Sequence, residues 1–301
     1  MNRPAPRSID QYLSQLRDAL KSEDPALVQD ALYDAEEYLR AELGQHPGKS
    51  EADVLELIAS TYGAPDEVAE AYRTTEKTVR AALKAPPPKP HPTALGRFFA
   101  IYTDSRAWTA LFYMLLSLVT GIFYFVVTVT GLSISAGLGV LIIGIPFFLL
   151  FIGFTRVLSL VEGRIVEGLL GVRMPRRPVR SAAGTTLVAR IKAMLIDPRT
   201  WTTLLYLVLM LPLGVLYFVL GIVMVALSFG LIAAPLAHLL AYLGVPDAGI
   251  QFDGWHAPWP VILPLAGIGI LLLTAFLHLA RGLGKVHGGL ARALLLSREP
   301  E

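Results

Sequence analysis

Two copies of one polar motif stand directly before long uncharged stretches of this sequence. The first copy is D-S-R-A-W-T at 104–109, and the second is D-P-R-T-W-T at 197–202. An acidic, a basic and an indole side chain at this spacing could bind a ligand or a lipid headgroup. The same residue types suit a helix that begins at a membrane surface, with Asp as cap, Arg facing anionic lipid and Trp at headgroup depth. We favour this second interpretation for Asp104, Arg106, Trp108, Asp197, Arg199 and Trp201.

A second set of polar residues lies in and after the apolar stretch near residue 240. Its indole rings offer flat apolar surfaces, and its carboxylates and imidazoles respond to charge or pH. We treat it as a candidate sensing segment, although an interfacial cap that anchors the next span explains the same residues. The set consists of His238, Asp247, Asp253, Trp255, His256 and Trp259.

The sequence gives no support for an enzyme, a metal site or a cofactor. It contains no cysteine, which excludes thiol catalysis and thiolate metal ligands. It also lacks the H-E-x-x-H, P-loop, G-x-S-x-G and dinucleotide motifs. His238 and His278 lie in apolar stretches without carboxylate or histidine partners at ligand spacing. We therefore expect no catalytic, cofactor-binding or metal-binding residues.

The composition and the charge distribution predict an integral membrane protein. The chain is 54% hydrophobic, with a mean hydropathy of +0.55. Residues 107–155, 200–246 and 254–280 contain no Asp, Glu, Lys or Arg. A charge at mid-bilayer costs about 2.5–3.5 kcal/mol on insertion scales, so such gaps are typical of spanning helices. The first 30 residues are polar, so we expect no cleavable signal peptide.

The sequence also contains an internal repeat. The second polar motif begins 93 positions after the first, and at this offset Gly121, Tyr124 and Phe125 fall on Gly214, Tyr217 and Phe218. After a longer segment in the second copy, the alignment resumes with Arg156 and Leu158 on Arg281 and Leu283. We expect two membrane hairpins made from one duplicated unit.

These patterns predict an all-α protein with a small cytoplasmic bundle and four spans. Residues 1–84 have helical spacing and caps. Acidic residues form a stripe on their second helix that could dock a basic partner, although we expect it to be a solvated face (Asp30, Asp34 and Glu37). Five prolines make 85–96 a stiff linker.

The first repeat, 97–178, has spans at about 109–130 and 138–160, a turn at 131–137, and a helix from 161 along the bilayer surface. The second, 179–301, has spans at about 202–228 and 261–280, with an enlarged outer segment at 229–260.

The positive charges predict that both termini are cytoplasmic. Lys and Arg occur before the first span, throughout 161–199 and in the C-terminal tail. The expected turns at 131–137 and 244–260 contain neither residue type. The basic segment 161–199 suits anionic lipid, and no nucleic-acid-reading module accompanies it. A fifth span at 229–243 would place Arg281 and Lys285 outside, so we reject it. For that segment we keep two interpretations, a re-entrant helix and an interfacial helix.

Two parts of the chain resemble known bacterial modules. L-Y-D-A-E-E-Y-L at 32–39 and Y-G-A-P-D-E-V-A-E-A-Y-R at 62–73 resemble the HAAS signalling domain, a small α-helical unit often fused to membrane segments and encoded near PadR-type regulators. The membrane half resembles the putative-sensor-type membrane domain of actinobacterial-type proteins, often found ahead of histidine kinase modules. The matching residues are the two D-x-R-x-W-T-x-L-x-Y motifs, G-x-x-Y-F-V at 121–126 and 214–219, and A-R-A-L-L at 291–295.

The resemblance implies a sensor or regulatory protein of the bacterial cytoplasmic (inner) membrane. Only six residues follow Leu295, so we expect its output to reach a separate cytosolic regulator, PadR-like or kinase-type, or another membrane protein through the N-terminal module. The expected partners also include membrane lipids, and self-association is compatible with this function. A transporter or channel component and a membrane scaffold are the alternatives. Against transport, the only charged residue inside an expected span is Arg156, near the end of the second.

Overall fold

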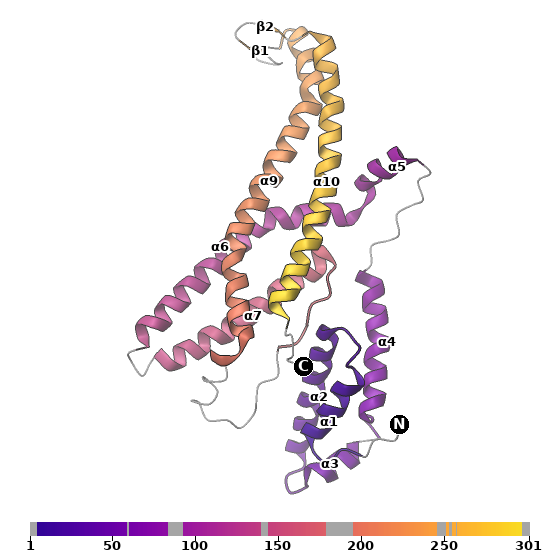
Figure 1. Cartoon of the computed structure of the whole chain (residues 1–301), viewed down its shortest axis with the longest axis vertical. Coiled ribbons are helices and arrows are strands. Elements are labelled where there is room, and N and C mark those ends of the chain that lie inside the picture. The colour runs from indigo at the N-terminus through magenta and orange to yellow at the C-terminus, as the bar shows by residue number, and fades with distance from the viewer. Residues whose placement is uncertain are drawn as a thin grey trace. The chain divides into compact units, whose positions relative to one another are not determined.

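The computed structural model describes residues 5–58, 60–83, 93–139, 144–178, 195–245, 251–252, 255–256 and 258–296 (Figure 1). The chain forms two compact units. Unit 1 comprises Met1–Lys84, Thr130–Tyr206 and Gly289–Glu301, and unit 2 comprises Ala85–Val129 and Leu207–Gly288. Most of the expected proline-rich linker, together with Asp247 and Asp253 of the candidate sensing segment, lies outside the described residues.

The N-terminal module in unit 1 is a helical bundle. Ser8 caps the first helix by accepting the amide of Gln11, and Asp24 caps the second, which begins at Pro25. Gly63, at a φ of 99°, makes the turn before the last helix. The core is built from leucines such as Leu16 and Leu20, which are fully buried. Helices α1, α2 and α4 lie side by side (Figure 1); the module consists of α1 (Ile9–Ala19), α2 (Pro25–Gln45), α3 (Glu51–Ile58) and α4 (Pro65–Leu83).

Long apolar helices form most of the remaining chain. They are preceded by α5 (Ala94–Phe99) and the 3-10 helix η1 (Ala100–Thr103), and they comprise α6 (Ser105–Leu138), α7 (Gly144–Leu170), α9 (Pro198–Tyr242) and α10 (Trp259–Leu295). Of the described helices, α6, α9 and α10 are long and apolar enough to cross a membrane. The protein is therefore helical with three candidate spans, and the expected fourth, in α7, is not among them.

The first predicted turn is helical in the structure. Residues 131–137 continue α6 as far as Leu138, and the hydroxyl of Ser135 donates to the carbonyl oxygen of Gly131 at 2.7 Å. A Cβ on Gly131 would lie 2.2 Å from the Phe151 ring, so this glycine permits close packing and does not mark a turn. The expected surface helix from residue 161 is likewise the last part of α7, which ends before Gly171 at a φ of 72°.

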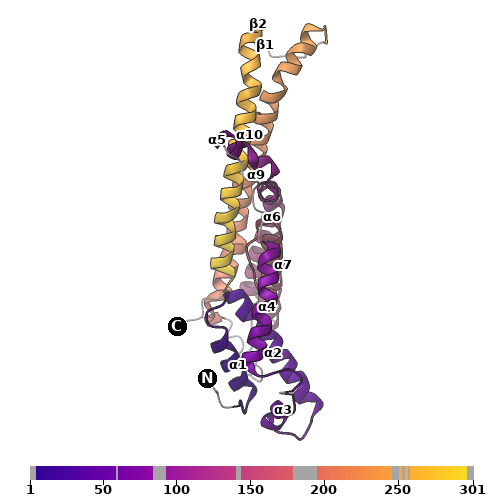
Figure 2. The same ribbon diagram turned by 90° about the vertical axis from the view of Figure 1, so that its right-hand side faces the viewer.

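The segment at 229–243 is neither re-entrant nor a separate interfacial helix. It continues α9 through Pro235 to Tyr242, where Gly244, at a φ of 88°, ends the helix. Forty-five residues give α9 a length of about 68 Å, which exceeds the roughly 30 Å hydrocarbon core. Figures 1 and 2 show α10 running beside it, and the two-residue strands β1 (Gln251–Phe252) and β2 (Trp255–His256) pair antiparallel in the connection between them.

Candidate functional site

The two polar entry motifs have the same local geometry. Asp104 accepts the amide N–H of Arg106 at 2.9 Å, and Asp197 accepts that of Arg199 at 3.0 Å. Each carboxylate therefore satisfies a backbone donor at the start of a long helix, as an N-cap does. This is the arrangement that a helix entry requires.

The tryptophans of the two motifs also make equivalent contacts. The indole N–H of Trp108 donates to the carbonyl oxygen of Tyr102 at 3.0 Å, and that of Trp201 donates to Leu195 at 2.8 Å. Both indoles remain substantially exposed. A fixed N–H and an exposed ring suit an interfacial anchor.

Each motif aspartate also faces an arginine from a helix that is distant in sequence. In unit 2, the guanidinium of Arg281 lies 2.8 Å from Asp104, and in unit 1 that of Arg156 lies 3.8 Å from Asp197. A second polar contact accompanies each ion pair. Tyr113 Oη lies 2.6 Å from His287 Nε2 in unit 2, and the Tyr206 hydroxyl donates to Glu162 at 3.0 Å in unit 1.

Among the described residues of the candidate sensing segment, the structure brings His238 and Trp259 together. The ring of His238 meets the ring of Trp259 edge-on at 4.8 Å, near the end of the α9–α10 pair. Trp255 and His256 belong to β2, paired through the backbone with Phe252 and Gln251. Within the described residues, no group of three potential ligands could hold a metal ion.

Sequence reasoning missed a buried ionic cluster that joins the N-terminal module to the segment after α7. Arg173 lies at its centre, and its guanidinium is 3.0 Å from Asp30, 3.2 Å from Glu76 and 3.5 Å from Glu167. Arg173 also donates to the carbonyl oxygen of Met174. We name Arg173, Asp30, Glu76 and Glu167 the Arg173 cluster; each side chain is at most 8% exposed.

The backbone that follows Arg173 continues this junction. The amides of Arg176 and Arg177 donate to one oxygen of Asp30 at 2.6 and 2.8 Å. The Arg177 guanidinium lies 2.6 Å from Asp34 and 5.7 Å from the centre of the Tyr33 ring. Helix α2 thus binds Arg173, Arg176 and Arg177 of one basic segment, and the module docks through a specific register.

The acidic stripe on α2 is therefore not a solvated face. Asp30 is 6% exposed and Asp34 pairs with Arg177, whereas Glu37 is exposed. The expectation was wrong because it considered the stripe alone. Carboxylates one helical turn apart, together with the run R-M-P-R-R at 173–177, are the signal that could have found the junction.

Burial disfavours the charged forms of Asp30 and Arg173, on which the ion pairs of the junction depend. Desolvation raises the pKa of Asp30 above its ordinary value, although the amide of Arg176 and the guanidinium of Arg173 lower it. The pKa of Arg173 is also raised: desolvation lowers it, but the hydrogen bond to Asp30 and the charges of Asp30, Glu76 and Glu167 together outweigh that effect. The net stabilisation of the junction is therefore smaller than its number of contacts suggests.

A last contact connects the module to the end of α10. The guanidinium of Arg292 lies 3.0 Å from the carboxylate of Asp24, the residue that caps α2. Asp24 is largely buried and Arg292 is partly exposed. Both residues belong to unit 1, so the C-terminal end of α10 and the N-terminal module occupy the same compact unit.

Long uncharged helices with tryptophans and arginines at their ends define a polytopic membrane protein. The Sensor family model, described as "Putative sensor", matches residues 113–295, which is more than half of the sequence. The chain belongs to this family. A search of curated proteins and a search of solved structures found no match. The match does not cover 1–84, whose likeness to the HAAS domain stays a prediction.

Proposed function

We propose that this protein is a sensor of the bacterial cytoplasmic membrane that regulates the availability of its N-terminal module. In the resting state the Arg173 cluster holds the module against the segment after α7. A membrane signal weakens this junction, and the module then becomes available to a cytosolic regulator. The family match supports a sensor role, and the Arg173 cluster is the observation that carries the proposed route.

The chemistry of the junction suits reversible docking. A buried ion pair gains little net stability, because desolvation offsets much of the attraction, yet removal of one partner costs about 3–5 kcal/mol. The raised pKa of Asp30 reflects this opposition. Docking also occupies Asp30 and Asp34, so a partner with clustered arginines would compete with Arg173 and Arg177 for the same carboxylates.

We further propose that the membrane domain consists of two duplicated hairpins with four spans, of which α7 is the second. The equivalent ion pairs of Asp104 and Asp197 and the equivalent indole contacts of Trp108 and Trp201 support the duplication. The Asp24–Arg292 contact supports an even number of crossings, because it keeps the module and the end of α10 on one side.

The sensor proposal is tested by a distance measurement between the docked parts. The chain has no cysteine, so Ser14→Cys and Gly168→Cys introduce a unique pair of spin labels at exposed positions. In lipid nanodiscs, the distance between the labels should be narrowly distributed. Arg173→Gln should broaden it and lengthen its mean, because three buried carboxylates lose their shared partner.

Arg164→Gln is the matched control. Arg164 also pairs with Glu167, at 3.6 Å, but its side chain is 51% exposed, so its loss should leave the distribution unchanged. A narrow distribution that survives Arg173→Gln would contradict docking through the cluster.

Transport is the second candidate function, and Glu162 is the residue that favours it. Its side chain is fully buried in α7 and accepts a hydrogen bond from Tyr206, which is also fully buried. Ionisable residues inside membrane helices often mark ion or proton paths. Flux of protons or ions into liposomes, lost in Glu162→Gln, would favour a transporter over a sensor.

A further inference from the structure

Helix α5 and the 3-10 helix η1 lie beside α10 in unit 2 (Figures 1 and 2). His278 of α10 donates its Nε2–H to the carbonyl oxygen of Phe98 at 3.0 Å, and the two rings stack with their centres 5.4 Å apart. The hydroxyl oxygen of Tyr102 lies 2.9 Å from that of Thr274. These contacts join the α5–η1 segment, residues 94–103, to one face of α10.

The contacts with α10 place the α5–η1 segment beside the candidate span. Residues 254–280 contain no charged side chain, and Arg281, which follows them, pairs with Asp104 at 2.8 Å. An ion pair that ends an uncharged stretch suits headgroup depth. Thr274 precedes Arg281 by seven residues, or about 10 Å along the helix, so its contact with Tyr102 lies on the hydrocarbon side of that ion pair.

The exposed side chains of α5 divide by chemistry between two faces. Leu95 and Phe99, one helical turn apart, are 71% and 36% exposed. Arg97 stands midway between them in the sequence, so it projects from the opposite face, and it is exposed as well. A helix that lies in a membrane interface has this arrangement, with apolar side chains toward the acyl chains and a basic side chain toward the phosphates. Helix α5 therefore fits a lipid leaflet better than water.

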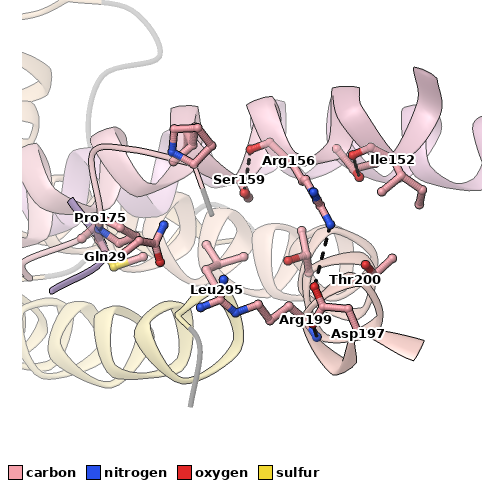
Figure 3. Close-up of a pocket in the computed structure, with 14 residues that line it drawn as sticks. Gln29, Ile152, Arg156, Ser159, Pro175, Asp197, Arg199, Thr200 and Leu295 are labelled. Carbon is pink, nitrogen blue, oxygen red and sulfur yellow. Dashed lines mark hydrogen bonds and ion pairs between the residues drawn. The ribbon is translucent and has the colours of Figure 1, made fainter. Parts of the chain in front are cut away.

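The contacts with α5 belong to the second repeat alone. The ion pair of the entry motif occurs in both repeats, as Figure 3 shows for Arg156 and Asp197 at the start of α9. The same alignment of the repeats places Leu149 and Gly153 where α10 has the threonine and the histidine of the α5–η1 contacts. Leucine and glycine side chains form no hydrogen bond. The contacts that hold α5 are thus not a consequence of the duplication.

The exposed face of α5 continues the surface that α10 presents to lipid, on which Leu271 and Leu279 are half-exposed beside the residues that contact α5. We propose that acyl chains cover this face, so that α5 lies in the lipid leaflet that contains Arg281. Leu95 and Phe99 then enter the acyl region, and the basic side chain between them meets the phosphates. The contacts with α10 hold the helix at this depth.

The proposal is tested with the full chain in vesicles of phosphatidylcholine and phosphatidylglycerol. Leu95→Cys gives a unique cysteine that carries the environment-sensitive fluorophore NBD. Lipids that carry a nitroxide on their acyl chains should quench this label strongly, whereas iodide in the water should quench it weakly. Ser14→Cys, at an exposed position of the N-terminal module, supplies the reference for a label in water.

Arg97→Cys is the matched control, because it lies in the same helix but on the opposite face. Its label should be quenched more by iodide and less by the nitroxide lipids than the label at Leu95. Equal quenching at the two positions would overturn the orientation of α5 and with it the proposal. A label at Leu95 that neither quencher reaches would show that protein, such as a second copy of the chain, covers the face in place of lipid.

The role of α10 is tested in the Leu95→Cys protein. His278→Ala removes the donor to Phe98, so it should lower the ratio of lipid quenching to iodide quenching. His278→Gln keeps an N–H donor and should restore most of the ratio. An unchanged ratio in His278→Ala would contradict the role of α10 in positioning α5. None of these outcomes depends on the docking of the N-terminal module.

Discussion

At the scale of single residues, Asp30 makes docking of the module depend on pH. Its pKa is raised in the docked state, so that state binds more protons than the undocked state at pH values above its ordinary value of 3.8. The Asp30 contribution is fully present below that pH and is lost as the pH rises through the docked pKa. Asp30→Asn should remove this part of the pH dependence. The measurement is the distance between the labels at positions 14 and 168, compared between the wild type and Asp30→Asn from pH 4 to 6.

The same variant separates charge from hydrogen bonding at neutral pH. Asparagine keeps an oxygen that can accept the amides of Arg176 and Arg177. Asp30→Asn should therefore undock the module less than Arg173→Gln does. Docking of Asp30→Asn that falls as steeply as wild type with rising pH would assign the titration to another group.

The buried contact between Tyr206 and Glu162 is a second residue-scale test. Tyr206→Phe leaves Glu162 without the 3.0 Å hydrogen bond that its carboxylate accepts, which should cost about 1.5–3 kcal/mol. Thermal unfolding in detergent measures the loss. Tyr33→Phe is the control, because Tyr33 is only partly buried and its ring, which contacts Arg177, is retained. Equal unfolding temperatures for the two variants would contradict a structural role for the contact.

At the scale of elements, two glycines set the crossing of α6 and α9. A Cβ on Gly121 would lie 2.4 Å from the carbonyl oxygen of Met210, and one on Gly214 would lie 2.3 Å from that of Ser117. Backbone atoms cannot move aside as a flexible side chain can, so Gly121→Ala and Gly214→Ala should each destabilise the protein by about 1–3 kcal/mol. Gly230→Ala is the matched control.

Gly230 lies in the same helix as Gly214, and its added Cβ would meet nothing within 4 Å. Alanine forms helices better than glycine by about 1 kcal/mol, so the control should be neutral or slightly stabilising. Unfolding temperatures in one detergent compare the three variants. Equal effects of Gly214→Ala and Gly230→Ala would mean that the close crossing is not required.

Features that depend on local sequence could be predicted, whereas features that depend on contacts between distant elements could not. Apolar runs and caps such as Asp24 act locally, so the helices of the module and the uncharged helices followed from the sequence. The prediction of a turn at 131–137 was wrong because Gly131 allows close packing against Phe151, and the sequence does not reveal such a long-range contact. The Arg173 cluster was missed for the same reason: Asp30 and Arg173 are 143 positions apart in the sequence, and neither segment alone indicates its partner.

At the scale of the whole molecule, the contact of Arg292 with Asp24 constrains the path of the chain. The module precedes α6 and Arg292 is close to the end of α10, so the contact between them agrees with the four crossings that we propose. Three described helices qualify as spans by length and composition. In the four-span proposal the fourth crossing is α7, in which Arg156 is the first charged residue.

Accessibility labelling distinguishes four crossings from three. Single cysteines at Ser14, Gly137, Gly168 and Leu243 are unique in this cysteine-free chain, and all four positions are exposed. With four spans, a membrane-impermeant maleimide added to intact cells should label Gly137→Cys and Leu243→Cys. Ser14→Cys and Gly168→Cys should react only after permeabilisation, because the basic residues near them favour the cytoplasmic face. If α7 did not cross, Gly168→Cys would react in intact cells together with Gly137→Cys, and the module could not dock on Arg173.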